Sequence, residues 1–215
     1  MSSTARRDDR PNPFHLWEQD EDFGPLFEAI TDRTLVDRPR CYILHRLALQ
    51  ARALDGDVAE IGVYKGGTAL LLRRTLDGSG KSIHLFDTYA GMPETDASKD
   101  EHRAGDFDDT SLKSVQAFVG TGPDVTFYAG LFPDTARGLE DRRFALVHVD
   151  ADICSSVRAC CEFFYPRTVA GGIILFDDYG WLSCPGALEA VDEFFAQRDE
   201  VPLYLPTGQC LVRKL

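Results

Sequence analysis

The chain has 215 residues, of which 44% are hydrophobic and 27% charged, and its formal net charge at pH 7 is −12. This composition is typical of a soluble globular protein with one domain and a sizeable core. The negative charge, with no basic stripe to offset it, argues against binding to nucleic acid or to an anionic membrane.

The N-terminal part of the chain predicts a loose segment followed by helices. Residues 1–22 are rich in Arg, Asp and Pro, which indicates a flexible segment. Residues 23–56 predict N-terminal helices, because helical periodicity runs over 25–55 in two pieces, the second opened by Pro39. No apolar run is long enough to span a bilayer, and the polar start, Met1 to Pro13, does not predict a signal peptide, so we expect a cytoplasmic protein.

From residue 57 onward, predicted strands alternate with predicted helices. The strands are expected at 57–63, 81–89, 124–132, 144–152 and 173–176, and the helices at 66–76, 111–120, 155–166 and 187–197. The tail, 201–215, predicts two short strands around residues 206–208. This alternation indicates α/β architecture over 57–215, with a doubly wound, mostly parallel sheet and an antiparallel C-terminal edge strand.

The six cysteines are scattered through the chain without a C-x-x-C pair. Cys160 and Cys161 are neighbours in an amphipathic stretch. We therefore expect buried thiols in a reducing cytoplasm, rather than disulfides or a zinc site. The other four are Cys41, Cys154, Cys184 and Cys210.

A glycine-rich turn, "EIGVYKGGTA" at 60–69, follows the first predicted strand. A dinucleotide site needs a glycine where Val63 stands, and a P-loop needs a lysine after its glycines, so both ligands are disfavoured. S-adenosylmethionine (SAM) needs close backbone approach, at Gly62 and at Gly66-Gly67, and an acid for its ribose hydroxyls. Asp87 ends the second strand and suits that role, while Glu60 is placed to accept from the turn's amides or from the methionine amino group. The alternative is that the glycines only cap a helix tightly against the sheet.

Acidic residues end two further strands. The apolar run of "GGIILFDDYGW" at 171–181 ends in Asp177 and Asp178, and Asp150 ends the preceding strand. The carboxyl ends of parallel strands meet at one edge of a sheet, where ligands bind. Three carboxylates there predict a hard cation, Mg²⁺ before Zn²⁺, to offset their repulsion. The alternative is that such aspartates cap helices, as Asp152 or Ser155 could for 155–166.

Over residues 40–215 the chain resembles the macrocin O-methyltransferase family, the TylF/MycF-type enzymes that methylate sugar hydroxyls on antibiotics. The matching segments are "EIGVYKGGTALLL", "LFDTYAGMPE", "GDFDDTSL", "AGLFPDT", "FALVHVDADICSS", "FFYPRTVAGGIILFDDYG" and "ALEAVDEFF". The combination of "DAD" and "FDDYG" is the most specific. Two departures concern the aglycone preference: the N-terminal region is shorter than in the macrolide enzymes, and Ile153-Cys154 replaces the aromatic residue usual after the DxD.

The resemblance implies a Rossmann-like class I SAM methyltransferase fold with a divalent cation at Asp150, Asp177 and Asp178. It also implies that the strand-four aspartate acts as base. We accordingly expect catalytic roles for Asp150 and Asp152 and substrate contacts from Met92, Tyr179 and Trp181. The cofactor-binding residues are expected to be Glu60, Gly62, Gly66, Gly67, Thr68, Asp87, Gly130, Phe132 and Asp150. We expect a homo-oligomer that acts on a small-molecule hydroxyl, from a sugar or glycoside.

Mg²⁺ would assist deprotonation of the acceptor hydroxyl and orient it, with Asp150 or Asp152 taking the proton. His148 is either a base or, in the simpler interpretation, a strand residue packed beside a helix. The loop 90–110 with His102 is either a lid or a solvated surface loop. Two other functions remain open: a catechol-type methyltransferase, and a SAM-binding protein without turnover. A nucleotide-sugar dehydrogenase or epimerase is disfavoured by Val63.

Overall fold

The computed structural model describes residues 16–215. It contains a seven-stranded sheet in the order β3-β2-β1-β4-β5-β7-β6. The strands are β1 (Asp57–Ile61), β2 (Ile83–Asp87), β3 (Val125–Ala129), β4 (Phe144–Val149), β5 (Thr168–Phe176), β6 (Leu203–Tyr204) and β7 (Cys210–Arg213). The first five are parallel, whereas β7 runs antiparallel to both β5 and β6. The predicted doubly wound sheet with antiparallel C-terminal strands is confirmed.

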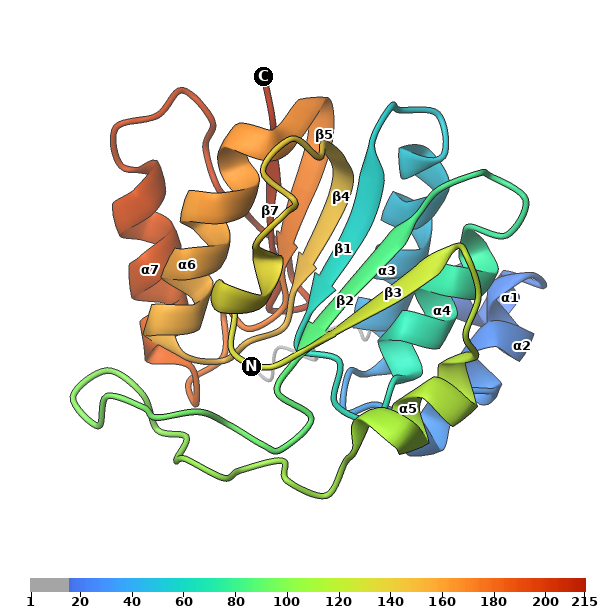
Figure 1. Cartoon of the computed structure of the whole chain (residues 1–215). Helices are drawn as coiled ribbons and strands as arrows, with labels where there is room; N and C mark the ends of the chain where they lie inside the picture. The colour runs from blue at the N-terminus through green and yellow to red at the C-terminus, as the bar shows by residue number, and fades with distance from the viewer. Residues whose placement is uncertain (1–15) are drawn as a thin grey trace, which may run out of the picture.

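Helices cover both faces of the sheet (Figure 1). On one face lie α3 (Arg38–Ala51), α4 (Gly67–Thr75) and α5 (Leu112–Val119), with the short α1 (Leu16–Gln19) and α2 (Phe23–Glu28) beside them. On the other face lie α6 (Cys154–Phe164) and α7 (Pro185–Phe195). Three 3-10 turns complete the described chain: Thr31–Arg33, Asp134–Ala136 and Tyr165–Arg167.

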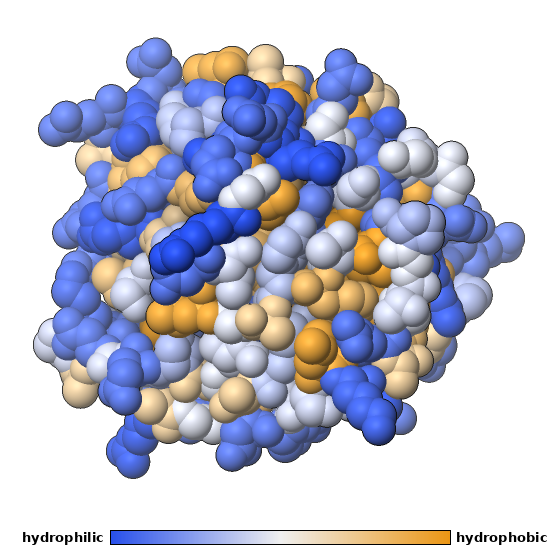
Figure 2. All heavy atoms as spheres, in the orientation of Figure 1, coloured by the Kyte–Doolittle hydropathy of each residue, from blue (hydrophilic) through white to orange (hydrophobic). Residues whose placement is uncertain are grey.

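The two helical layers explain why the strands are apolar on both sides. Leu85 and Leu146 pack in the cluster under α3 and α4, whereas their neighbours Phe86 and Val147 pack under α6. Successive strand residues point to opposite faces, so each strand needs apolar residues throughout. Figure 2 shows hydrophilic side chains along the margin of the same view, with smaller hydrophobic areas between them.

The N-terminal helices follow the predicted pattern within the described residues. Asp37 caps α3 by accepting a hydrogen bond from the Arg40 amide at 3.0 Å, and Pro39 lies in the first turn as expected. The segment predicted to be flexible, 1–22, contains α1 from residue 16, and Trp17 packs edge-on against Tyr42. Its first fifteen residues lie outside the described part.

Two further predictions can be compared with the fold. All six cysteines are buried free thiols, so the expected absence of disulfides is confirmed. Within residues 16–215, no helix is long and apolar enough to cross a membrane.

Candidate active site

A cavity of about 310 Å³ opens at the carboxyl edge of the parallel strands. This is the edge at which doubly wound sheets bind ligands. Among the residues predicted from sequence, those that line the cavity are Gly62, Thr68, Asp87, Met92, Gly130, Phe132, Asp150, Asp152, Asp178 and Trp181. The structure thus brings together residues from the ends of the five parallel strands and the loops that follow them.

Gly62 allows the ends of β1 and β4 to meet. A Cβ at Gly62 would lie 1.7 Å from the backbone oxygen of Asp150, and the residue adopts a φ of +85°. Both facts require glycine at this position. The turn after β1 therefore places the predicted cofactor loop directly against the residue that begins the acidic cluster.

Gly66 and Gly67 serve the packing of α4 and do not line the cavity. A Cβ at Gly66 would meet the side chains of Val115 and Val119, and one at Gly67 would meet the backbone oxygen of Arg33 at 2.7 Å. Gly66 is the left-handed residue that begins the helix, with φ of +89°. For these two glycines the structure supports the helix-capping alternative.

The carboxylate of Asp87 holds the glycine turn in shape. Its Oδ2 accepts hydrogen bonds from the amides of Val63 at 2.7 Å and Tyr64 at 2.8 Å, and its Oδ1 accepts from the Tyr89 amide at 2.6 Å. From the sequence, Glu60 is a candidate acceptor for either the turn amides or the methionine amino group, and in the structure the amides of Val63 and Tyr64 donate to Asp87 instead. Since Asp87 also lines the cavity, it remains available to a bound cofactor.

Glu60 belongs to a buried network behind the cavity. Its Oε1 lies 3.0 Å from Nδ1 of His148, and its Oε2 is buried without a hydrogen-bond partner among the described residues. His148 is fully buried on β4 and does not line the cavity. Burial would lower the pKa of His148, but hydrogen bonds to Asp177 and Glu60 outweigh it and raise that pKa well above its usual value. Since both of its nitrogens face buried carboxylates and it does not line the cavity, the structure favours the packing interpretation of His148.

The positive charge beside Asp177 comes from the protein. Arg40 of α3 forms an ion pair with Oδ2 of Asp177, while Oδ1 accepts from Nε2 of Gln209 at 2.7 Å and lies 3.4 Å from Nε2 of His148. Burial would raise the pKa of Asp177, yet His148, Arg40 and Gln209 lower it overall. Asp177 is fully buried and does not line the cavity. Sequence reasoning missed Arg40, because 137 residues separate the partners and nothing local marks the contact.

Asp150 and Asp178, by contrast, lack a cationic partner. Among residues 16–215, no side chain forms an ion pair with either of them within 4 Å. Burial and the charge of Asp177 raise the pKa of Asp150 well above its usual value. Burial, followed by the charges of Asp152 and Asp150, does the same for Asp178. Oδ2 of Asp178 accepts a hydrogen bond from the Asp152 amide at 3.0 Å, which holds the two strand ends together.

The excess of negative charge fits a divalent cation at this edge. Asp150 and Asp178 supply hard oxygen donors, the type that Mg²⁺ prefers, and neither forms an ion pair among the described residues, although His148 and Arg40 partly offset the charge of Asp150. Asp177 fits less well, because both of its oxygens already accept hydrogen bonds from Arg40, Gln209 and His148. Of the predicted metal ligands, Asp150 and Asp178 are therefore the stronger pair.

The raised pKa of Asp150 predicts a pH-dependent stability in EDTA. A carboxyl whose folded-state pKa exceeds its unfolded value destabilises the protein at neutral pH, and this cost disappears as the pH falls through the raised pKa. Asp150→Asn should therefore be more resistant to urea than wild type at neutral pH. The advantage should shrink as the pH approaches about 4, the ordinary aspartate value. Urea titrations across this pH range measure the stability of both proteins. A stability difference that does not change with pH would contradict the raised pKa of Asp150.

The two aromatic residues after Asp178, Tyr179 and Trp181, lie in different surroundings. Trp181 lines the cavity with its ring under the guanidinium of Arg40, 4.8 Å from carbon to centroid. Tyr179 is absent from the lining, and its hydroxyl donates to Oδ1 of Asp192 on α7 at 2.8 Å. Trp181 is thus placed for substrate contact, and Tyr179 packs under the next helix.

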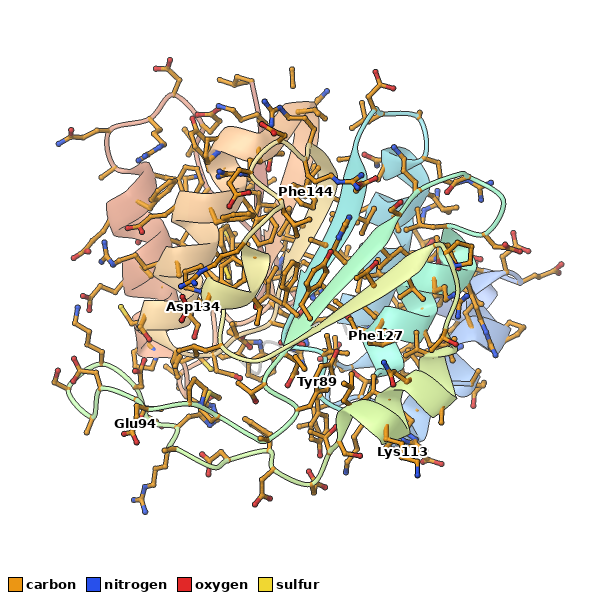
Figure 3. All side chains as sticks on the ribbon, viewed as in Figure 1. Tyr89, Glu94, Lys113, Phe127, Asp134 and Phe144 are labelled. Atoms are coloured by element: carbon orange, nitrogen blue, oxygen red, sulfur yellow. The ribbon has the colours of Figure 1, made fainter. Side chains whose placement is uncertain are left out.

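The long loop after β2 lies beneath the carboxyl ends of the strands (Figure 1). Figure 3 shows Tyr89 near the edge of the sheet and Glu94 farther out along this loop. The loop is anchored where the Cys154 amide donates to Oδ1 of Asp100 at 2.9 Å and where Lys99 pairs with Glu189 of α7. Met92 and His102 line the cavity from the loop. This placement supports a lid rather than a loop that only meets solvent.

The sequence is similar to one known family over most of its length. The family model described as macrocin-O-methyltransferase (TylF) matches residues 30–203. A mycinamicin III 3''-O-methyltransferase of Micromonospora griseorubida is 31% identical over 157 residues, covering 66% of this chain and 61% of that protein. The 4'-O-methyltransferase of 8-demethyl-8-(2,3-dimethoxy-alpha-L-rhamnosyl)-tetracenomycin-C from Streptomyces olivaceus is 30% identical over 152 residues, covering 64% and 58% respectively. The chain spans about three fifths of the length of the curated relatives it matches.

Solved structures show the same fold. The O-methyltransferase NovP superposes with a TM-score of 0.75 at 22% identity, over 85% of this chain and 82% of that chain. The calicheamicin methyltransferase CalS11 superposes with a TM-score of 0.71 at 15% identity, over 90% and 93% of the two chains. At these identities the likeness concerns the arrangement of helices and strands.

Proposed function

Because the chain belongs to the macrocin O-methyltransferase family, we propose that it transfers the methyl group of SAM to a hydroxyl of a sugar or glycosylated natural product. One observation carries this proposal: a single cavity joins the glycine turn at Gly62 to the unpaired carboxylates of Asp150 and Asp178. The relatives named above are O-methyltransferases of a mycinamicin and of a rhamnosyl-tetracenomycin, which supports a sugar hydroxyl as acceptor.

The cofactor is proposed to bind at the end of the cavity formed by the turns after β1, β2 and β3. Gly62, Asp87 and Gly130 line this end, and Phe132 adds an apolar wall. The amides of Val63 and Tyr64 are held by Asp87, so the turn is shaped before any ligand binds. Such preorganisation lowers the cost of binding.

The acceptor hydroxyl is proposed to bind at the acidic end of the cavity. Asp150 and Asp178 would hold a Mg²⁺ ion there, which would stabilise the developing alkoxide. Asp150 or Asp152 takes the hydroxyl proton, since burial raises the pKa of both and a raised pKa favours proton acceptance. Trp181 offers a ring face against which a sugar can stack.

Turnover with radiolabelled SAM tests the proposed reaction. The full chain should methylate at least one member of a panel of glycosides with Mg²⁺ present and lose that activity in EDTA. Activity restricted to catechols would favour the catechol-type alternative. Cofactor binding without turnover on any glycoside or catechol would favour a SAM-binding protein.

Cofactor binding should not require the metal, because Asp87, the proposed cofactor contact, is a different group from the Asp150 and Asp178 carboxylates proposed to bind the cation. Calorimetry in EDTA should show binding of S-adenosylhomocysteine to wild type. Asp87→Ala should weaken this affinity about tenfold or more, because it removes a hydrogen bond to a charged group and leaves the amides of Val63, Tyr64 and Tyr89 without their acceptor. Unchanged affinity in the variant would remove Asp87 from the cofactor site.

A further inference from the structure

Three side chains of different chemistry converge beside the acidic edge. They are His102 from the loop after β2, Asp152 after β4, and Cys184 at the start of α7. Sγ of Cys184 lies 3.5 Å from Oδ1 of Asp152 and 3.7 Å from Nε2 of His102, and these last two atoms lie 3.6 Å apart. All three residues line the cavity.

The triangle formed by these atoms has the size of one face of a tetrahedral metal site. Zinc binds nitrogen or oxygen at about 2.0 Å and sulfur at about 2.3 Å, so tetrahedral geometry places neighbouring ligand atoms about 3.3–3.5 Å apart. The three observed separations lie within a few tenths of an ångström of these values. No backbone movement is needed to bring the ligands together.

A second carboxylate orients the histidine as in known metal sites. Nδ1 of His102 lies 3.5 Å from Oδ2 of Asp106, and the same Oδ2 accepts a hydrogen bond from the Arg103 amide at 2.9 Å. A carboxylate on the outer nitrogen fixes the imidazole so that the other nitrogen faces the metal. Asp152 is also held in place, because its amide donates to Asp178 and its φ is +56°.

The other cluster of mixed ligands in the described chain lacks these properties. His148, Asp150 and Asp177 also bring ligand atoms close together. Both nitrogens of His148 are already engaged by Glu60 and Asp177, and Arg40 pairs with Asp177. A cation there would displace existing partners. By contrast, among the described residues the polar contacts of His102 Nε2 are with Asp152 and Cys184, and the Cys184 sulfur adds only the Ser183 hydroxyl at 3.5 Å, which a metal would not have to break.

We propose that His102, Asp152 and Cys184 form a second metal site, selective for a borderline ion such as Zn²⁺ and separate from the oxygen-only site of Asp150 and Asp178. Sulfur and imidazole ligands favour such an ion over Mg²⁺. The site joins the long loop to β4 and α7, so metal binding closes the loop over the cavity. It also engages Asp152 and leaves Asp150 as the base for the proposed reaction. From the sequence, no zinc site is expected at the cysteines, and these ligands, 50 and 32 residues apart, lack a zinc-binding spacing that could have indicated one.

Cobalt(II) is the probe that tests the site. Metal-depleted full-length protein should take up one equivalent of Co²⁺ and show a near-ultraviolet band from thiolate-to-cobalt charge transfer, with visible bands typical of tetrahedral coordination. Zn²⁺ should abolish the bands, and an excess of Mg²⁺ should leave them unchanged. This readout does not depend on methyl transfer.

Variants identify the ligands. Cys184→Ser should lose the charge-transfer band, while Cys154→Ser, which alters another buried thiol at the start of α6, should keep it. His102→Asn, on the loop, should lose the tetrahedral bands, and Asp106→Asn should weaken Co²⁺ affinity about 10- to 100-fold. Asp178→Asn should keep the bands even if methyl transfer is lost, which separates this site from the proposed function.

Loop closure gives a second measurement. Zn²⁺ should slow tryptic cleavage after the exposed Arg103 in wild type but not in Cys184→Ser. A wild-type protein without the charge-transfer band would overturn the proposal. So would a band that survives Cys184→Ser, or one that Mg²⁺ removes, since the ion would then occupy a different site.

Discussion

Asp178→Asn should abolish most methyl transfer while leaving the metal-free protein as stable as wild type or more so. Asn keeps the size of the side chain and can still accept the hydrogen bond from the Asp152 amide. It deletes a carboxylate whose pKa is raised by burial and by Asp152 and Asp150. Removing one electrostatic group from the acceptor site should lower kcat about 10²- to 10³-fold. Rates with saturating SAM and thermal melts in EDTA measure the two effects.

The stability gained on adding Mg²⁺ distinguishes an aspartate that binds the metal from one that only caps a helix. Wild type should gain stability with Mg²⁺, by about 2.7 kcal/mol at a hundred times the dissociation constant, and Asp178→Asn should gain much less. An N-cap or a merely hydrogen-bonded aspartate would behave differently, since its loss costs about 0.5–2 kcal/mol whether or not metal is present. Equal gains in both proteins would rule out Asp178 as a ligand.

A surface aspartate provides the control. Asp134, labelled in Figure 3, lies on a 3-10 turn. It pairs with Arg137 at 2.8 Å, and both side chains are largely exposed. Asp134→Asn removes the same charge from the chain, so it changes the net charge equally. It should alter neither the rate nor the gain from Mg²⁺, because exposed ion pairs contribute little.

The fold was predictable because its signal is local. Apolar runs such as Ile173–Phe176 end at turn residues, and helical periodicity fills the segments between them, so the alternation defines a parallel sheet. The topology then places Asp87, Asp150 and Asp178 at one edge without any knowledge of distant contacts. The predictions for the first four strands ran too far at the carboxyl end, as at Gly62, where a positive φ stops β1 two residues early.

The partners of the site residues were not predictable, because they come from distant parts of the chain. In the sequence, Asp177 and Asp178 are equivalent candidates for a metal ligand. Because successive side chains at a strand end point to opposite sides, Asp177 lies in the layer under α3 and Asp178 lines the cavity. Under α3 the carboxylate of Asp177 meets Arg40 and Gln209, which are 137 and 32 residues away in the sequence. Glu60 is likewise drawn to His148 on the same face of the sheet. The position of a residue at a strand end predicts which other strand-end residues lie near it. Its chemical role depends on the side of the strand to which its side chain points.

Arg40→Met should destabilise the protein by about 3–5 kcal/mol, the cost of removing one partner from a buried ion pair. Met preserves much of the aliphatic volume but leaves Asp177 with only His148 and Gln209. The variant also loses the hydrogen bond from Arg40 to the Leu35 oxygen at 3.2 Å. Urea unfolding measures the loss. Arg46→Met on the same helix is the matched control, because the Arg46 side chain is exposed, although its partner Asp20 is not, and an ion pair at the surface is worth about 0–1 kcal/mol.

The double variant Arg40→Met/Asp177→Asn shows whether the loss comes from the uncompensated charge. If it does, removing both charges should restore much of the stability that Arg40→Met loses, with a coupling well above that of distant sites. The pH dependence should agree. The pKa of Asp177 is lowered in the folded state, so the stability from this pairing is present above the ordinary aspartate pKa and is lost as the pH falls through the lowered value. The difference in unfolding free energy between wild type and Arg40→Met should therefore become smaller in acid.

Magnesium gives this variant a further use, because it tests Asp177 as the third metal ligand. If Arg40 permanently supplies the counter-charge of Asp177, Mg²⁺ should stabilise Arg40→Met and wild type by similar amounts, through Asp150 and Asp178. If Asp177 can also bind the cation, removing Arg40 frees an oxygen, and Mg²⁺ should stabilise the variant more than wild type. A loss below about 1 kcal/mol for Arg40→Met would contradict the buried pair itself, since that is the value expected of an exposed one.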